Sequence, residues 1–411
     1  MSAWPIDAIR AQFPSLTRPF DANRPVVYFD NPAGTQVPRR VIDAVSGYFE
    51  HNNANSGGVF ATSMDSDAMV TATREKLALF LNAPRADEIV LGPNMTTLNF
   101  SLSRAIAQTL NPGDEIVLTR MDHDANVSPW LRIAQDRGLV VKYVELRRED
   151  CTLDLNTLEA ALTEKTKLVA TVHASNAVGT VNPVAQIAGM AHAAGAYHVV
   201  DAVQSAPHVS IDVQAIGCDF LLCSAYKYFG PHVGVMWGRY DLLASLPAYK
   251  VRPSKDVPPN RWETGTPAFE LYAGTGACID YLASLSGSDT TTRASLVTAY
   301  ERMADYEREL AGHLLDVLAR FPAVHVAGIT DVSRMAERVP TVVFSVDGMT
   351  PSEVAEHLAG HGIFVWDGNY YAVEIMRALD KPEGMVRVGL AHYNTHEEID
   401  RFAEALDALL A

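Results

Sequence analysis

The most restrictive feature of the sequence is the alternation of short apolar segments with amphipathic stretches between residues 88 and 237. Short apolar segments bounded by turn residues indicate buried strands, and the stretches between them have the pattern of helices. This alternation is typical of a mainly parallel sheet with crossover helices, so we predict an α/β fold. The predicted strands are 88–91, 115–118, 140–146, 168–172, 198–200, 220–222 and 233–237.

A small polar stretch at 286–292 is typical of a hinge between domains. Beyond it we predict a long helix at 294–321, strands at 341–346, 363–366 and 386–390, and a helix at 351–359. A final helix begins with a capping box formed by Thr395 and Glu398. We therefore expect a large domain at 21–285 and a smaller α+β domain at 286–411, with residues 1–20 packing on the small domain.

Composition excludes several classes of partner. The net charge of −16 argues against nucleic acid and anionic membranes, which would repel the chain. The four cysteines have no CxxC spacing, so we expect buried thiols in a reducing compartment rather than disulfides or a metal site. Residues 1–7 have no signal-peptide pattern, and no apolar segment is long enough to span a membrane. We expect a soluble cytoplasmic protein.

Lys227 and Asp201 are the two residues that indicate chemistry. Lys227 follows an apolar strand in the run Cys-Ser-Ala-Tyr-Lys-Tyr-Phe-Gly-Pro, and Asp201 ends another apolar run. A buried lysine is costly unless it is neutralised or its amine reacts. A strand-end lysine and a strand-end carboxylate suit pyridoxal phosphate (PLP), which binds through an imine and a protonated ring nitrogen. Taken singly, a solvated lysine and a turn-capping aspartate are the ordinary alternatives.

Further candidates follow neighbouring strands, where parallel sheets place functional residues. The segment 94–97 opens a helix whose free N–H groups suit a phosphate, although a threonine N-cap would explain it equally. His123 is placed to stack on a pyridine ring, although alone it would be an ordinary loop histidine, and Asn176 is placed to donate to a cofactor oxygen or to a substrate carboxylate. Arg387 is a charge inside an apolar strand, which favours a bound carboxylate or a structural ion pair.

Two other cofactor classes are disfavoured by the sequence. The histidines have no paired metal-ligand spacing, so we predict no metal. The Gly-rich segments do not form GxGxxG on a βαβ unit, which disfavours a nicotinamide cofactor.

Together these residues resemble class V PLP-dependent enzymes of fold type I, specifically the group II cysteine desulfurase-like proteins, across nearly the whole chain. The order and spacing of the matching segments make the resemblance specific. These segments are 28–34, 95–97, 123–130, 175–176, 201–204, 224–227, 263–267, and Arg387 together with 393–398.

The resemblance implies a role for each matching residue. Lys227 would carry the cofactor imine, Asp201 would pair with the ring nitrogen, and His123 would stack on the ring. Gln204 would contact the phenolic oxygen, while the substrate carboxylate would be bound at Asn176, Arg387 and Ala33. The phosphate would be held by Met95, Thr96, Thr97, Ser224 and Tyr226, and by Thr266 from the other subunit of a homodimer.

The sequence departs from this family where desulfurases place a nucleophilic cysteine on a loop. No cysteine follows Cys278; Tyr371 stands about where the thiol would be, and Trp366 replaces an arginine of the family pattern. The histidine that usually precedes the lysine is replaced by Tyr226. A persulfide needs a thiolate, so a persulfide mechanism and transfer of sulfur to a carrier protein are disfavoured.

The leading hypothesis is therefore β-elimination from a cysteine-type amino acid, releasing a thiol or persulfide, pyruvate and ammonia. Lys227 would act as the base, and Tyr371 or Tyr370 would protonate the leaving group or form an aromatic wall. The alternatives are an epimerase or racemase of the isopenicillin N epimerase type, and then an aminotransferase. A PLP-binding protein without turnover is the non-enzymatic alternative, against which the predicted carboxylate clamp argues.

Overall fold

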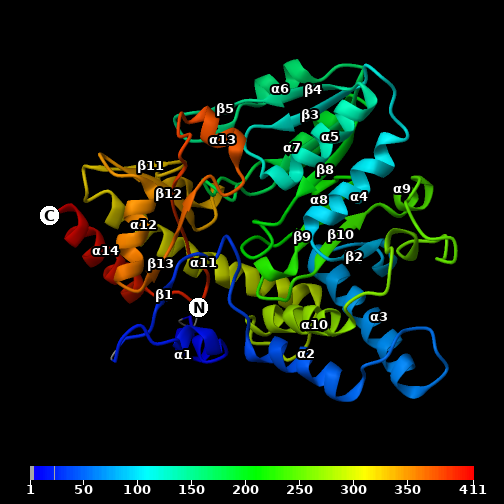
Figure 1. Cartoon of the computed structure of the whole chain (residues 1–411), viewed down its shortest axis with the longest axis horizontal. Coiled ribbons are helices and arrows are strands. Elements are labelled where there is room, and N and C mark those ends of the chain that lie inside the picture. The colour runs from blue at the N-terminus through cyan, green and yellow to red at the C-terminus, as the bar shows by residue number, and fades with distance from the viewer. Residues whose placement is uncertain (1–3, 23) are drawn as a thin grey trace.

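A seven-stranded sheet forms the centre of the larger part of the molecule in a computed structural model that describes residues 4–22 and 24–411 (Figure 1). Strand β10 is antiparallel to β2 and β9, and the pairs from β9 through β8, β7 and β3 to β4 are parallel. The predicted mainly parallel α/β fold is confirmed. In sheet order the strands are β2 (Ile89–Gly92), β10 (Gly234–Gly238), β9 (Phe220–Ser224), β8 (Tyr197–Asp201), β7 (Thr166–Val172), β3 (Glu115–Thr119) and β4 (Val140–Val144).

Helices cover both faces of this sheet because its strands are apolar on both sides. In β9, Phe220 and Leu222 pack in a cluster with helices α4 and α5, whereas Leu221 and Cys223 pack with α3 and α10. Alternate residues of a strand point to opposite faces, which produces these two cores. The helices named are α3 (Ala61–Leu81), α4 (Met95–Ala107), α5 (Ser128–Arg137) and α10 (Phe269–Ser284).

A four-stranded antiparallel sheet organises the C-terminal part, on the left in Figure 1. The single strand predicted at 363–366 is in fact two, because β13 pairs with β1 while β14 joins the sheet. Strand β11 was not predicted. The bounds are β11 (Val324–Ala327), β12 (Thr341–Val346), β15 (Met385–Gly389) and β14 (Trp366–Gly368), with β1 (Val27–Tyr28) and β13 (Ile363–Phe364) beside them.

Three helices pack on these strands around a separate apolar cluster. They are α11 (Arg293–Leu318), α12 (Pro351–Gly360) and α14 (His396–Leu410). The capping box predicted at Thr395 is confirmed, since its side chain accepts from the Glu398 amide and Glu398 accepts from the Thr395 amide. The remaining helices and hairpin strands are α1 (Ile6–Arg10), α2 (Arg39–His51), α6 (Leu155–Ala161), α7 (Val184–Ala193), α8 (Val213–Ile216), α9 (Tyr240–Ser245), α13 (Val373–Ala378), β5 (Leu146–Arg147) and β6 (Thr152–Leu153).

The N-terminal segment contacts both parts of the molecule. Its Phe13 ring packs on Tyr281 of α10 at 5.4 Å and on Tyr393 at 4.7 Å, and Arg10 pairs with Glu398 of α14 at 2.9 Å. Residues 1–3 of the predicted segment 1–20 lie outside the described residues. The domain limits at 20 and 285 stay predictions.

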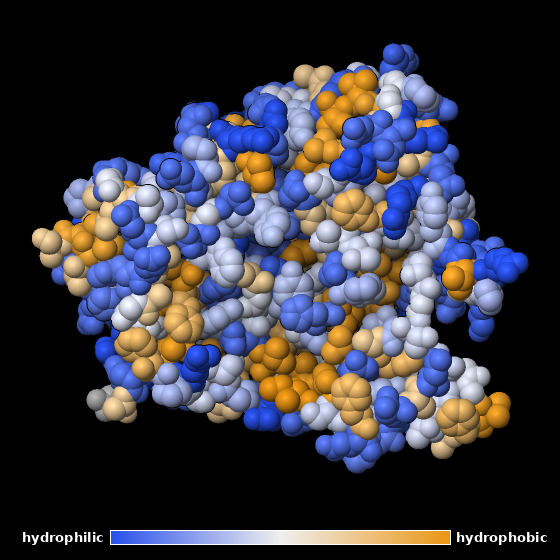
Figure 2. Space-filling model, viewed as in Figure 1, coloured by the Kyte–Doolittle hydropathy of each residue, from blue (hydrophilic) through white to orange (hydrophobic). Residues whose placement is uncertain are grey.

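The surface is largely hydrophilic in the view of Figure 2, where apolar residues gather below the centre and in further groups near the top right and at the left. Among the described helices, none combines the length and the apolar character needed to cross a bilayer.

Candidate active site

The carboxyl edge of the large sheet brings the predicted residues together. Asp201 is the last residue of β8, Ser224 is the last residue of β9, and α4 begins directly after β2. Parallel strands end at one edge, so their terminal side chains share a cavity. This inner cavity is lined by Asn94, Met95, Thr96, His123, Ala125, Val172, Ala174, Asn176, Asp201, Val203, Gln204, Ser224, Tyr226 and Lys227.

Lys227 lies at the end of a short 3₁₀ helix, Ala225–Lys227, that follows β9. Its Nζ donates to the carbonyl oxygens of Pro32 and, at 2.9 Å, of Ala33. Burial, followed by the charge of Arg387, lowers the pKa of Lys227 to about 7, against the opposing effects of Asp30 and Asp201. A substantial fraction of the amine is therefore neutral and nucleophilic near neutral pH.

Asp201 is a buried carboxylate with little to stabilise its charge. It is 2% exposed, and its Oδ1 accepts from the Val203 amide at 2.8 Å. Burial raises the pKa of Asp201 to about 6, against the opposing effects of that hydrogen bond and of Lys227. A cationic group placed against this carboxylate would stabilise its ionised form.

The turn between β2 and α4 offers hydrogen-bond donors to an anion. The Met95 amide donates to Ser224 Oγ at 2.9 Å, and Asn94 caps the helix by accepting from the Thr97 amide at 2.8 Å. The cap is thus Asn94 and not a threonine. The Thr96 amide belongs to the first turn and has no intrahelical acceptor, and Thr96 lines the cavity. Such a helix start is suited to phosphate.

His123 presents a neutral imidazole to the cavity. Burial, followed by the charges of Lys227 and Arg387, lowers the pKa of His123 to about 4. Its Nδ1 accepts from the Ala125 amide at 3.0 Å, which leaves the hydrogen on Nε2. The ring stacks against Tyr371 with centroids 5.6 Å apart.

A buried network that the sequence analysis missed fixes the loop of His123. Asp122 is 1% exposed and accepts from the Asn126 side chain at 2.7 Å and from the Thr119 hydroxyl. Burial raises the pKa of Asp122 to about 8. The sequence shows an aspartate next to the candidate histidine, but it does not indicate that this aspartate is buried.

Arg387 lies in the middle of β15 and is 3% exposed. It forms an ion pair with Asp30 at 3.2 Å and donates to the Asn176 carbonyl at 3.0 Å. Its Nε has no hydrogen-bond partner among the described residues. Of the two partners predicted for Arg387 from the sequence, the structural ion pair is present. The N–H at Nε has no acceptor among the described residues, so a bound carboxylate could still accept from it.

The segment 369–372 covers Arg387. In the family that the chain resembles, this segment would carry the nucleophilic cysteine. The Tyr370 ring lies 4.4 Å from the Arg387 guanidinium carbon, and Tyr370 accepts from the Asn176 side chain at 2.9 Å through its carbonyl. Tyr370 and Tyr371 have φ of 53° and 57°, in the left-handed region that non-glycine residues seldom adopt. Tertiary contacts must hold this segment in place.

The two tyrosines have different surroundings. The Tyr370 hydroxyl donates to the Met385 carbonyl, and the side chain is buried. Tyr371 is 70% exposed, and its carbonyl accepts from the Asp124 amide at 2.7 Å. The phenol of Tyr371, but not that of Tyr370, is therefore accessible to a substrate.

Not every predicted residue reaches the Lys227 cavity. Thr97 and Thr266 line a different cavity of about 410 Å³, together with Arg104 and His232. The predicted contribution of Thr266 to a second subunit stays a prediction, as does the cofactor contact of Thr97. Tyr226 reaches the cavity, and its ring stacks on His232 at 4.8 Å and lies 4.9 Å from Lys227 Nζ.

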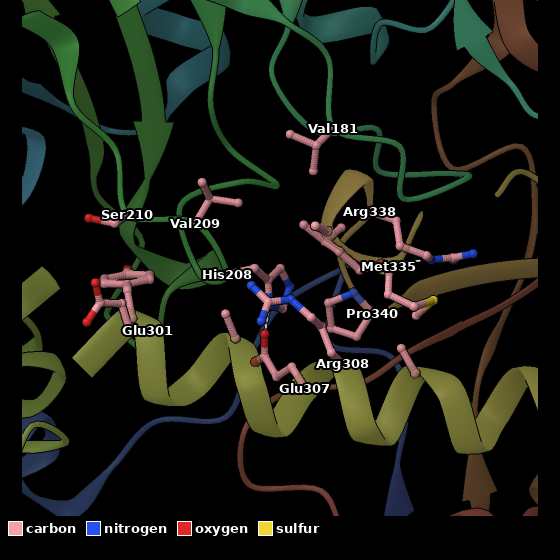
Figure 3. A pocket seen from close by; sticks show the side chains of 15 residues that line it. Val181, His208, Val209, Ser210, Glu301, Glu307, Arg308, Met335, Arg338 and Pro340 are labelled. Atoms are coloured by element: carbon pink, nitrogen blue, oxygen red, sulfur yellow. Dashed lines mark hydrogen bonds and ion pairs between the residues drawn. The ribbon is translucent and has the colours of Figure 1, made fainter. Parts of the chain in front are cut away.

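A separate cavity of about 290 Å³ lies between α11 and the segments around 208–210 and 335–340 (Figure 3). His208 and Glu307 form a buried pair there at 2.8 Å. None of the residues predicted from the sequence lines it.

The four cysteines are free and buried, as expected, and none lines the cavities that contain Lys227. Burial raises the pKa of Cys151 to about 11 and that of Cys223 to about 12, and it raises the pKa of Cys218 and Cys278 as well. These thiols are poor nucleophiles where they stand.

The residues present fit pyridoxal phosphate. Among the described residues, no cation is in direct contact with the buried Asp201 carboxylate. The α4 turn offers donors to a phosphate, and the amine of Lys227 faces the same cavity. Two buried side-chain oxygens in this cavity, Asn176 Oδ1 and Gln204 Oε1, have no partner among the described residues. A polar ligand in the cavity would supply the hydrogen-bond donors that these oxygens lack.

Together the fold and this site define a PLP-dependent enzyme built on a mainly parallel sheet. The family model described as "Aminotransferase class-V" matches residues 27–402, and the chain belongs to this family.

The proteins to which this chain is similar include cysteine desulfurases. A cysteine desulfurase of Serratia proteamaculans is 33% identical over 99% of this chain and 98% of its own. A probable cysteine desulfurase of Synechocystis is 34% identical over 98% and 95%. Among solved structures, the apo cysteine desulfurase of Thermococcus onnurineus has a TM-score of 0.89 at 28% identity, covering 100% of this chain and 99% of that one. The chain is thus a cysteine desulfurase-like enzyme of the class V family.

Proposed function

We propose that this enzyme is a C–S lyase that cleaves a cysteine-type amino acid by β-elimination, without a persulfide on the protein. The observation that carries the proposal is the absence of a thiol at the site: Tyr371 occupies the loop, and all four cysteines of the chain are buried away from Lys227. A lysine, a carboxylate clamp and an accessible phenol remain, and these suffice for elimination.

PLP held at this site would supply an electron sink for the bonds at the substrate's Cα. Asp201 would hold the ring nitrogen protonated, and His123 would lie flat against the ring. The Ser224 hydroxyl and the first turn of α4, with Met95 and Thr96, would hold the phosphate. The Gln204 amide donates to the Thr341 hydroxyl at 3.4 Å, and a half-turn would direct its Nε2 to the phenolic oxygen.

The substrate carboxylate would bind at Arg387 and Asn176. The open Nε of Arg387 supports this, because a buried guanidinium N–H without a partner is costly. A carboxylate bound there would bring the substrate's Cα toward the Lys227 amine, which lines the same cavity as Arg387 and donates to the carbonyls of Pro32 and Ala33.

Lys227 would then remove the Cα proton as a general base, a role suited to an amine whose pKa burial lowers to about 7. The Cβ–S bond breaks, its electron pair leaves with sulfur, and the Tyr371 hydroxyl would deliver the proton to the thiolate. Water completes the balance, so that R–S–CH₂–CH(NH₃⁺)–COO⁻ and H₂O give R–SH, pyruvate and NH₄⁺. Tyr370 would not act as the acid, because its hydroxyl is already bonded to the Met385 carbonyl.

The test is product analysis with S-methyl-L-cysteine and the PLP-loaded enzyme. We expect equal amounts of methanethiol, pyruvate and ammonia, and no additional mass of one sulfur atom on any cysteine peptide after incubation with L-cysteine. Recovery of the substrate with inverted configuration and with solvent deuterium at Cα would instead establish an epimerase. Amino transfer that requires a second keto acid would establish the aminotransferase. Either result, or a persulfide on the protein, would overturn the proposal.

A further inference from the structure

An outer cavity of about 460 Å³ continues the site away from the sheet. Its inner wall carries Lys227, Asn176 and Arg387, the groups proposed to act on the amine and carboxylate of the substrate. Its lining also includes aromatic side chains, among them Phe100, Trp366 and Tyr371, and the last two are largely exposed to solvent. The cavity therefore has a polar end, where the reaction would occur, and an aromatic end.

The register of the small sheet fixes the aromatic end relative to the carboxylate clamp. Trp366 of β14 pairs directly with Arg387 of β15 in the antiparallel ladder. Directly opposed residues in such a ladder extend to the same face with Cβ atoms about 5 Å apart. The Trp366 and Arg387 side chains therefore leave the same face of the sheet from neighbouring positions.

Two of these rings are exposed to an unusual degree for aromatic residues. Trp366 is 52% exposed and Tyr371 is 70% exposed, although both line a cavity. Rings of this size dominate binding energetics when they are covered, and binding cavities are lined mainly by apolar and aromatic groups. A ligand that extends beyond the reacting atoms would cover them.

The charges of the cavity indicate what this ligand carries at its outer end. The side chains with full charges that line the cavity are Lys227, Arg387 and Asp124. The first two belong to the reacting end, and Asp124 already accepts from the Ser128 hydroxyl at 2.6 Å. Among the described residues, the aromatic end thus offers ring faces and no cation, which disfavours an anionic group and favours an apolar one.

We propose that the natural substrate is a cysteine S-conjugate whose sulfur bears an aromatic or large apolar substituent, packed against Trp366, Phe100 and Tyr371. This inference rests on the proposed lyase function. Free cysteine would leave the aromatic end uncovered, whereas a benzyl-sized group on sulfur reaches it from a carboxylate bound at Arg387.

The experiment compares S-benzyl-L-cysteine with S-methyl-L-cysteine. We expect kcat/KM to be about tenfold to a hundredfold higher for the benzyl conjugate, the gain expected from burying a phenyl-sized group. Trp366→Ala should remove most of this preference by lowering kcat/KM for the benzyl conjugate much more than kcat/KM for the methyl conjugate. Trp366→Phe, which keeps an aromatic ring, is the matched control and should keep most of it.

A binding measurement separates this inference from the lyase function. The analogues 3-(benzylsulfanyl)propanoate and 3-(methylsulfanyl)propanoate lack the amine, so neither can condense with the cofactor. Calorimetry should show tighter binding of the benzyl analogue by at least about tenfold, and Trp366→Ala should abolish the difference. If this difference is found but neither conjugate is cleaved, the aromatic subsite stands and the lyase function fails. If both conjugates are cleaved equally and both analogues bind equally, the inference is overturned while the lyase function stands.

Discussion

Replacing Asp30 by asparagine tests the ion pair that holds Arg387 beneath the site. The charged atoms are 3.2 Å apart, and the side chains are 4% and 11% exposed. At an effective dielectric constant of about 20, unit charges at this separation attract by about 5 kcal/mol. Desolvation offsets much of this attraction, because burial raises the pKa of Asp30 against the effect of Arg387. Asparagine keeps an acceptor oxygen but leaves the buried charge of Arg387 unpaired, so the expected loss of stability is about 3 kcal/mol.

The assay is thermal unfolding of the PLP-free protein. At about 2.1 cal/mol/K of unfolding entropy per residue, a loss of about 3 kcal/mol lowers the Tm of a chain of this size by about 3 to 4 °C. The control is Asp305→Asn, which breaks an exposed pair with Arg308 whose side chains are 50% and 45% exposed. Such exposed pairs contribute less than about 1 kcal/mol.

Asp30→Asn should also leave the Arg387 charge free for a ligand. The carboxylate 3-(benzylsulfanyl)propanoate is therefore expected to raise the Tm of this variant more than that of the parent. An Asp30→Asn protein as stable as Asp305→Asn, or one that the carboxylate stabilises no better than the parent, would refute this account of Arg387.

Two further predictions concern Tyr370 and Lys227. Tyr370→Leu removes the ring that lies 4.4 Å from the Arg387 guanidinium carbon, and it should weaken binding of the same carboxylate by up to about tenfold. Tyr370→Phe keeps the ring and should bind nearly as well as the parent; equal binding by all three proteins would contradict a role for the ring. Because burial lowers the pKa of Lys227 to about 7, its reactive neutral fraction grows as pH rises. The initial rate of PLP incorporation should rise about tenfold from pH 6 to pH 8 and then level off, whereas a lysine of ordinary pKa would give a rate still rising at pH 9.

Much of the large domain and its reactive pair could be predicted from the sequence because the signals are local. Each strand of the large sheet is a short apolar segment, and Lys227 and Asp201 follow such segments directly. Carboxyl ends of parallel strands meet at one edge, so adjacency to a strand was enough to place both residues in one cavity.

The parts that escaped prediction depend on contacts between distant segments or on short elements. Asp30 and Arg387 are 357 residues apart, and the two-residue strands β1 and β13 are too short to show a period. Helix α10 packs against both α2 and α3, so it is apolar over most of its surface and has little amphipathic periodicity.

The aromatic cover of Arg387 was hidden for a different reason. Tyr370 reaches the guanidinium only because it adopts a left-handed backbone conformation, which a sequence of two tyrosines does not indicate. Tyr370 and Tyr371 are therefore interchangeable in the sequence, whereas in the structure Tyr370 is buried and hydrogen-bonded and Tyr371 is exposed.

The central claim is that the Lys227 amine binds PLP covalently. Borohydride reduction of the PLP-loaded protein, followed by peptide mass spectrometry, tests it most directly. We expect the phosphopyridoxyl mass on the peptide that contains Lys227, together with loss of the visible absorbance band, and neither in Lys227→Ala. A colourless loaded protein, or a reduced label on any other lysine, would contradict the account.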